Sequence, residues 1–125
     1  MTMANKIRVL IIDDNEDVTE AVSDYIESIG DSCTSLNDAK QGLEVIKKEG
    51  QNYDAIILDL AMPDFSGYDV LESLKNEGLL ESNNIILFTA SSIPDKEAEA
   101  IGVKTILRKP LSLEELEATI NRFRH

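Results

Sequence analysis

The sequence has little positive charge and no long apolar run. Its 125 residues carry 12 Lys and Arg against 24 Asp and Glu, which gives a formal net charge of −12. A surface of this sign repels nucleic-acid phosphates and anionic lipid headgroups. We therefore expect neither a direct nucleic-acid partner nor a membrane partner. No apolar run approaches the ~20 residues that a bilayer-spanning helix needs.

Cysteine is also scarce. The one cysteine, Cys33, cannot form a disulfide within the chain. Disulfides are common in oxidising compartments and rare in the cytoplasm. The first residues, Met1–Lys6, lack the apolar stretch and the small-residue cleavage site of a secretory signal. We therefore expect a cytoplasmic protein.

The remaining composition is that of one folded domain. Hydrophobic residues make up 42% and charged residues 29% of the chain, a balance typical of globular rather than disordered proteins. A length of 125 residues fits one domain, because domains usually have ~100–150 residues. No linker, repeat or low-complexity segment interrupts the chain. We expect a single domain over residues 5–124, without an output domain in this chain.

Alternating patterns along the chain predict strands and helices in turn. Three short runs rich in Ile, Leu and Val indicate strands buried on both faces, as in a parallel sheet. These runs are residues 7–12, 54–60 and 85–89; residues 103–107 predict the last strand, and residues 32–36 are a weak strand candidate. Apolar residues at helical spacing predict helices over residues 18–29, 38–50, 70–78 and 112–123, and residues 94–100 predict a short, poorly amphipathic helix. Asp38 with Gln41, and Ser112 with Glu115, have the spacing of capping boxes.

Five strands alternating with five helices predict an α/β fold. Such a doubly wound (βα)5 chain forms a five-stranded parallel sheet, and right-handed crossovers cover the sheet on both sides. Ligands of these folds bind beyond the carboxyl ends of the strands, where the strand order reverses. Functional residues are therefore expected at the carboxyl ends of the strands.

Polar residues stand where four of the predicted strands end. Asp13 and Asp14 follow the first strand, and Asp59 ends the third. Thr89 ends the fourth strand and Lys109 follows the fifth. Three carboxylates at one edge of a sheet repel one another unless a cation lies between them, and Mg²⁺ prefers oxygen ligands. The charge of Lys109 suits a phosphoryl oxygen, and the hydroxyl of Thr89 can donate to one.

Each of these residues has an ordinary explanation when it is taken alone. Asp13 or Asp14 is a typical helix cap, Thr89 a typical β-branched strand residue, and Lys109 a solvated loop lysine. Asp59 is harder to explain, because a carboxylate directly after Ile-Ile-Leu loses solvation. Their joint placement at four strand ends favours one site that binds a metal ion and a phosphoryl group.

The sequence resembles the receiver domains of two-component response regulators over almost its whole length. The acidic pair Asp13–Asp14, the hydroxyl of Thr89 and the pair Lys109–Pro110 match positions of that family. Residues 59–67, Asp-Leu-Ala-Met-Pro-Asp-Phe-Ser-Gly, match its phosphoacceptor segment. The resemblance implies a flavodoxin-like sandwich with the strand order 2-1-3-4-5. It also implies a lysine–proline bond of the kind that the family often holds in cis.

The resemblance implies a phosphoacceptor that signals by protein contact, and not an enzyme. Asp59 would accept a phosphoryl group from a histidine kinase, a histidine phosphotransfer protein or a small phosphodonor. The reaction would need Mg²⁺, for which Mn²⁺ could substitute. Asp14 and Asp59 would ligate the metal directly together with the backbone carbonyl of Ala61, and Asp13 would act through water.

The resemblance also implies that Thr89 and Lys109 bind the phosphoryl oxygens and that Thr89 takes part in a conformational switch. The family usually has Tyr or Phe three residues before its lysine, and Ile106 stands there in this chain. Residues 89–102 are also about two residues shorter than usual, which indicates a truncated or irregular fourth helix. We expect intact phosphorylation with a weakened switch. Because Ala61 cannot orient an attacking water, we expect the phosphorylated state to decay slowly.

Other functions are compatible with parts of this pattern. The chain could be a receiver fragment of a longer hybrid kinase or regulator, or a receiver-fold adaptor that has lost switching because of Ile106. A phosphatase of the haloacid-dehalogenase kind also uses an aspartate at a strand end, but it needs a second acid where Ala61 stands. A flavodoxin-like flavin site is excluded, because residues 13–17 would repel the cofactor's phosphate.

Overall fold

A computed structural model describes residues 6–90, 102–103, 105–110 and 112–124 of the chain. The described residues contain five strands, four α-helices and one short 3₁₀ helix. The strands are β1 (Arg8–Ile12), β2 (Ser32–Leu36), β3 (Ala55–Asp59), β4 (Ile85–Thr89) and β5 (Thr105–Arg108). The helices are α1 (Glu16–Ser28), α2 (Ala39–Glu49), η1 (Gly50–Asn52), α3 (Gly67–Asn76) and α5 (Leu113–Asn121).

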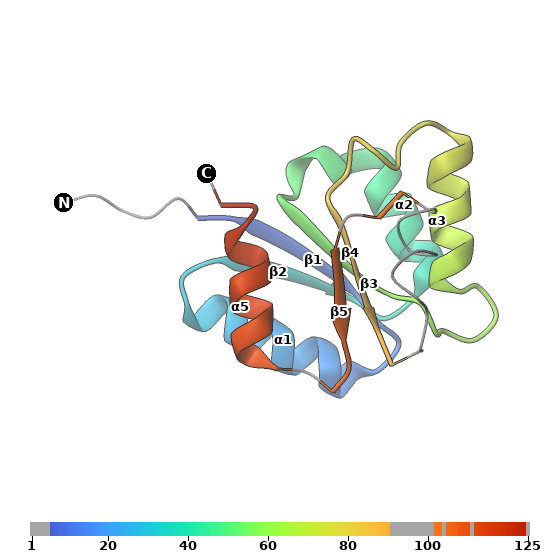
Figure 1. Cartoon of the computed structure of the whole chain (residues 1–125). Helices are drawn as coiled ribbons and strands as arrows, with labels where there is room; N and C mark the ends of the chain where they lie inside the picture. Colours follow the sequence, from blue (N-terminus) through green and yellow to red (C-terminus); the bar gives the residue numbers. More distant parts are fainter. Residues whose placement is uncertain (1–5, 91–101, 104, 111, 125) are drawn as a thin grey trace.

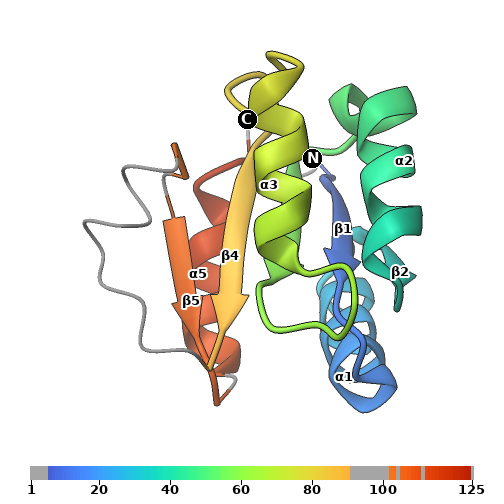
Figure 2. The same cartoon turned by 90° about the vertical axis from the view of Figure 1, so that its right-hand side faces the viewer.

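The strands form one parallel sheet in the order β2-β1-β3-β4-β5. The predicted fold class and strand order are therefore confirmed. Helices α1 and α5 cover one face of the sheet, and α2 and α3 cover the other (Figures 1 and 2). The fifth predicted helix, over residues 94–100, lies outside the described residues. The prediction placed the last strand about two residues too early, because β5 begins at Thr105 and ends at Arg108.

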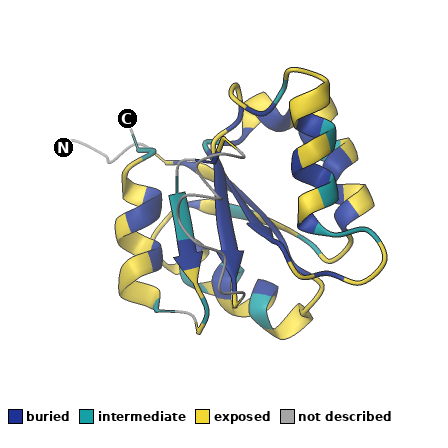
Figure 3. Cartoon of the chain, turned by 45° about the vertical axis from the view of Figure 1, so that its right-hand side comes forward, coloured by how far each residue is buried: buried dark blue, intermediate teal, exposed yellow. Residues whose placement is uncertain are grey.

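The strands are apolar on both faces because both faces are covered. Successive side chains of a strand point to opposite sides of the sheet. Leu10 and Ile56 therefore pack in the layer of α2 and α3, while Ile11 and Ile57 pack in the layer of α1 and α5. Every residue of β3 and β4 is buried, as the dark strands of Figure 3 show. Among the described residues, no helix is long and apolar enough to span a membrane.

Side-chain caps fix where the helices begin. Asp38 accepts a hydrogen bond from the backbone N–H of Lys40 (3.2 Å) at the start of α2. Ser112 accepts one from the N–H of Glu115 (3.3 Å) at the start of α5. A complete capping box, which the sequence patterns did not predict, joins Ser66 and Asp69 before α3. Because each of these caps lies in the loop that follows a strand, the helix starts lie at the same edge of the sheet as the predicted site.

An ion pair with a buried aspartate lies at the opposite end of the sheet, where the strands begin. The carboxylate of Asp31, whose side chain is 2% exposed, accepts hydrogen bonds from both terminal nitrogens of Arg124 (2.7 and 2.6 Å). It also accepts one from the backbone N–H of Ile7 (3.1 Å). The hydrogen bonds from Arg124 hold the pKa of Asp31 below its ordinary value of 3.8, although burial opposes this shift. The pair thus fastens the residues that follow α5 to the residue that precedes β1.

Candidate functional site

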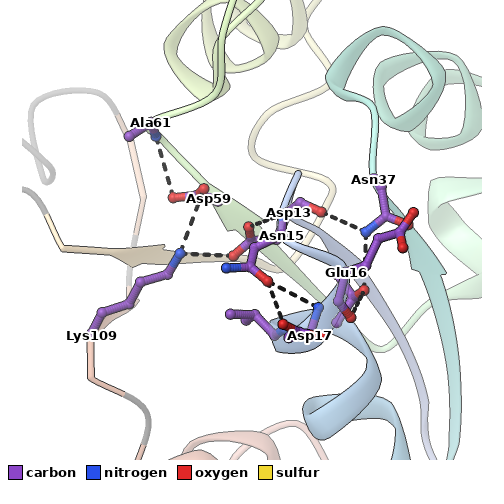
Figure 4. Close-up of polar contacts among 10 residues, drawn as sticks. Asp13, Asn15, Glu16, Asp17, Asn37, Asp59, Ala61 and Lys109 are labelled. Carbon is purple, nitrogen blue, oxygen red and sulfur yellow. Dashed lines mark hydrogen bonds and ion pairs between the residues drawn. The ribbon is translucent and has the colours of Figure 1, made fainter.

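The structure brings together the predicted acids and lysine at the carboxyl ends of the strands. Carboxylate oxygens of Asp13, Asp14 and Asp59 all lie within 4.8 Å of one another. Asp13 and Asp59 are buried, and Asp14 is exposed. Figure 4 shows the side chain of Lys109, which follows β5, pointing toward Asp13 and Asp59. Residues separated by almost a hundred positions therefore form one site.

Lys109 neutralises part of the acidic charge. Its ammonium nitrogen lies 2.9 Å from Oδ2 of Asp13 and 3.6 Å from Oδ2 of Asp59. The same nitrogen lies 5.0 Å from the centre of the Phe88 ring, a distance at which the ring attracts a cation. Burial lowers the pKa of Lys109, but the hydrogen bond and charge of Asp13, together with the charge of Asp59, leave that pKa above its ordinary value. The lysine is therefore held in its charged form.

One lysine does not balance the charge of the cluster. Burial, and then the charge of Asp13, raise the pKa of Asp59 to about 6, although the charge of Lys109 works in the opposite direction. A further cation near its oxygens stabilises the charged form of a carboxyl group whose pKa is raised in this way. The donor set consists of carboxylate oxygens, and one of the three acids is open to solvent. These residues fit Mg²⁺, which takes one or two carboxylates and keeps several waters.

The loop after β3 is hydrogen-bonded to the side chain of Asp59 and to the main chain directly after it. The backbone N–H of Ala61 donates to Oδ1 of Asp59 (3.3 Å). The N–H of Gly67 donates to the carbonyl of Leu60 (3.1 Å), which closes the loop back onto the end of β3. Asp64 adopts a left-handed backbone conformation inside this loop, with φ of 62°. The loop therefore returns tightly enough to bring the first turn of α3 against the end of β3.

Two asparagines that the sequence analysis missed hold Asp13. The backbone N–H of Asn15 donates to Oδ1 of Asp13 (3.0 Å), and the side chain of Asn15 caps α1. The side-chain amide of Asn37 donates to the backbone carbonyl of Asp13 (2.9 Å). Asn37 could have been found from the sequence, because it directly follows the weak second strand and so stands at the same sheet edge as the acids.

Thr89 and Ile106 lie on the β4–β5 side of the site. Thr89 is buried, and its carbonyl accepts the backbone N–H of Lys109 (3.0 Å). The register pairs Leu87 with Ile106 and Thr89 with Arg108, so the side chains of Thr89 and Ile106 point to the same face of the sheet. Ile106 packs against the apolar cluster of α2 and α3. The Lys109–Pro110 peptide bond is cis.

Comparison with known proteins agrees with this architecture. The family model of the response regulator receiver domain matches residues 9–121. A probable chemotaxis protein CheY of Rhizobium etli is 28% identical over 123 residues, which cover 96% of this chain and 94% of that protein. The hybrid signal transduction histidine kinase G of Dictyostelium discoideum is 32% identical over 98% of this chain, but the match covers only 4% of that kinase. The chain likewise spans 50% of the transcriptional regulatory protein CiaR of Streptococcus pneumoniae, to which it is 29% identical.

Solved structures show the same fold. The receiver domain of the Francisella response regulator 1452 superposes with a TM-score of 0.83 at 27% identity, and the match covers 94% of this chain and 96% of that one. The chemotaxis response regulator CheY4 of Vibrio cholerae gives a TM-score of 0.81 at 26% identity, with 95% and 99% covered.

The chain belongs to the response regulator receiver domain family of two-component signal transduction. Domains of this family are signalling phosphoacceptors rather than turnover enzymes, they bind Mg²⁺ at a cluster of aspartates, and they interact with histidine kinases or phosphotransfer proteins. The acidic cluster of this chain is of that kind. The family membership gives no support to the alternative of a phosphatase of the haloacid-dehalogenase kind.

Proposed function

We propose that this chain accepts a phosphoryl group on Asp59 from a histidine kinase or a histidine phosphotransfer protein and then signals by contact with another protein. The observation that carries the proposal is the convergence of three carboxylates and one ammonium group at the end of β3. Asp59 lies 3.6 Å from the ammonium group of Lys109 and within 4.8 Å of both other acids. Its carboxylate is the nucleophile in the proposed transfer.

In this proposal the three acids contribute to the Mg²⁺ site in different ways. We propose that Asp14 and Asp59 ligate the ion directly with the backbone carbonyl of Ala61, and that Asp13 acts through water. The exposure of Asp14 and the contact between Asp13 and Lys109 support this division. When bound, Mg²⁺ neutralises negative charge on the transferring phosphoryl group, and Mn²⁺ is the expected substitute.

Thr89 and Lys109 bind the phosphoryl oxygens in this proposal. The ammonium group of Lys109 already lies beside Asp59. The hydroxyl of Thr89 comes from the neighbouring strand β4, whose Phe88 pairs with Asp59 in the sheet. Because phosphoryl transfer depends mainly on positioning and charge stabilisation, these two groups supply most of what the protein adds beyond the metal site.

The bounds of the domain, its self-phosphorylation, its location in the cell and the lifetime of its phosphorylated form are also proposed. We propose that the receiver unit covers residues 5–124, that it phosphorylates itself from small phosphodonors, and that it acts in the cytoplasm. The free thiol of Cys33 supports the last point. Ala61 offers no polar side chain to an attacking water, so the phosphorylated form is expected to lose its phosphoryl group slowly.

Intact mass spectrometry after incubation with acetyl phosphate and Mg²⁺ tests the chemistry. We expect one phosphoryl adduct that disappears in Asp59→Asn and in the presence of a chelator. Asp64→Asn is the matched control, since it makes the same change in the same loop at a backbone conformation that Asn tolerates. An adduct that persists in Asp59→Asn, or its absence from wild type, would contradict the proposal.

The weakened switch is tested separately from the chemistry. Ile106 has no polar tip and packs against the α2 and α3 layer, so it cannot follow the hydroxyl of Thr89 as an aromatic residue with a hydroxyl could. We expect the phosphoryl mimic beryllium trifluoride to shift amide resonances near Asp59 and at the end of β5 beside Lys109 in wild type, but not at Thr105 and Ile106. Ile106→Tyr should extend the shifts to these two residues, and Ile106→Val should not. Wide shifts along β5 in wild type would refute a weakened switch.

A further inference from the structure

Asn37 joins two loops of the site through both protons of its side-chain amide. The amide nitrogen donates to the backbone carbonyl of Asp13 (2.9 Å) and to Oγ1 of Thr19 (3.0 Å). The hydroxyl of Thr19 in turn donates to the carbonyl of Glu16 (3.1 Å), and Thr19 is 3% exposed. Figure 4 shows Asn37 reaching across from the end of β2 to Asp13. The loop before α2 is thereby tied to the loop before α1.

The hydrogen bond from Asn37 to Asp13 continues the hydrogen bonding between β1 and β2 beyond their last paired residues. The backbone N–H of Asp13 donates to the carbonyl of Leu36 (3.1 Å), as in a parallel ladder. In a continuing ladder, the carbonyl of Asp13 would accept the backbone N–H of Asp38. The chain instead bends at Asn37, and Asp38 caps α2. The side chain of Asn37 supplies the missing donor.

This bond acts on the orientation of Asp14. The carbonyl of Asp13 belongs to the peptide unit that leads into Asp14, and a peptide unit is planar. A donor that fixes this carbonyl therefore fixes the direction in which the main chain enters Asp14. Asp14 is the exposed member of the acidic cluster, so it has little packing of its own to hold it.

We propose that Asn37 is a positioning residue for the acidic pair Asp13–Asp14 and thereby sets the affinity of the site for Mg²⁺. The inference rests on the proposed function in that it takes the acidic cluster as the Mg²⁺ site. Asn37 contributes no ligand; it holds the main chain from which the two carboxylates project. Outer partners of this kind typically change metal affinity about 10–100-fold when they are removed.

The chain offers a matched control at the other end of the sheet. The side-chain amide of Asn84 donates to the backbone carbonyl of Asp54 (2.9 Å), which is the same kind of bond to the same kind of residue. Asn84→Ala therefore removes an equivalent hydrogen bond before β3, away from the acidic cluster. Thr19→Val is a second variant, since it removes one partner of Asn37 and leaves the bond to Asp13 in place.

Calorimetric titration of the unphosphorylated protein with Mg²⁺ measures the effect. We expect the dissociation constant to rise about tenfold in Asn37→Ala, to rise less in Thr19→Val, and to stay at the wild-type value in Asn84→Ala. The carbonyl ¹³C resonance of Asp13 should move in Asn37→Ala, which a purely global destabilisation would not cause selectively. If Asn37→Ala does not fold, the comparison of Thr19→Val with Asn84→Ala decides.

The outcomes separate this inference from the proposed function. Wild-type protein that binds Mg²⁺, with an equal affinity in Asn37→Ala, would overturn the role of Asn37 alone. Equal weakening in Asn37→Ala and Asn84→Ala would also overturn it, because the loss would then follow stability rather than position. Wild-type protein that binds no Mg²⁺ would overturn both this inference and the proposed metal site.

Discussion

A methyl group added at Gly67 would meet the main chain that carries Asp59. The new Cβ would overlap the carbonyl oxygen of Asp59 and lie 2.7 Å from Cα of Leu60. Neither atom can move without moving the end of β3. We therefore expect Gly67→Ala to displace Asp59, although the substitution changes no side chain of the acidic cluster.

The magnitude follows from what the methyl group meets. Overpacking a tight site usually costs about 1–3 kcal/mol, and a collision with backbone belongs at the upper end of that range. We expect Gly67→Ala to lower the free energy of unfolding by about 2–3 kcal/mol. Gly42, inside α2, is the comparison variant: its new Cβ would lie 2.6 Å from Cδ1 of Ile12 and 3.0 Å from its Cγ1 and Cγ2, so it meets side-chain atoms and not the main chain. The gain in helix propensity of ~1 kcal/mol also offsets part of the cost at Gly42.

Urea unfolding and Mg²⁺ titration, measured on the same samples, check this prediction. Gly67→Ala should lose both stability and Mg²⁺ affinity, whereas Gly42→Ala should keep the affinity of wild type whatever its stability. Wild-type affinity in folded Gly67→Ala would refute the reasoning, because the end of β3 would then tolerate the methyl group without moving Asp59.

Three further predictions concern other parts of the fold. Because Arg124 lowers the pKa of Asp31, the stability that their ion pair contributes is full above pH 3.8 and is lost as the pH falls through the lowered pKa. Arg124→Ala should therefore cost about 2–4 kcal/mol at pH 7, and urea unfolding should show this difference shrinking below pH 3.8. Burial raises the pKa of Cys33 to about 11, so iodoacetamide at pH 8 should alkylate it slowly in the native protein and rapidly in urea. Asp64→Val should destabilise the loop after β3 by about 1–2 kcal/mol, because its left-handed conformation suits Gly or Asn and not a β-branched residue.

Each of these predictions can fail on its own. A cost of Arg124→Ala that stays constant down to pH 2 would show that the charge of Asp31 is not what the pair stabilises. Rapid alkylation of Cys33 in native protein would contradict the raised pKa of its thiol. Asp64→Gly serves as the control for Asp64→Val, and equal stability of the two variants in urea would contradict a left-handed conformation at this position.

The sequence predicted the centre of the fold better than its edges. The runs that became β3 and β4 are apolar up to their last residue, because both faces of these strands are covered. The polar residues that end them therefore stood out, and the meeting of Asp59 with Lys109 followed from the parallel topology. Edge strand β5 has only one buried residue, Leu107, so its apolar pattern did not mark its start.

The supporting contacts of the site could not be predicted in the same way. The bond from Asn37 depends on how two loops meet after their strands have paired, and no periodic pattern records this. The contact between Lys109 and Phe88 depends on which face of β4 the ring occupies. The capping box of Ser66 and Asp69 is local and could have been found, because the two residues have the required spacing.

Successive side chains of β4 point to opposite faces of the sheet, so the residues of the site contact both helix layers. Phe88, under the ammonium group of Lys109, packs among the side chains of α1 and α5. The next residue, Thr89, points toward the opposite layer, the one in which Ile106 packs. A phosphoryl group that draws in both the hydroxyl and the ammonium group would therefore pull on both sides of the sheet at once. If the phosphoryl group binds as proposed, Ile106 would weaken the response only in the α2 and α3 layer, and the ring of Phe88 would still connect the site to the layer of α1 and α5.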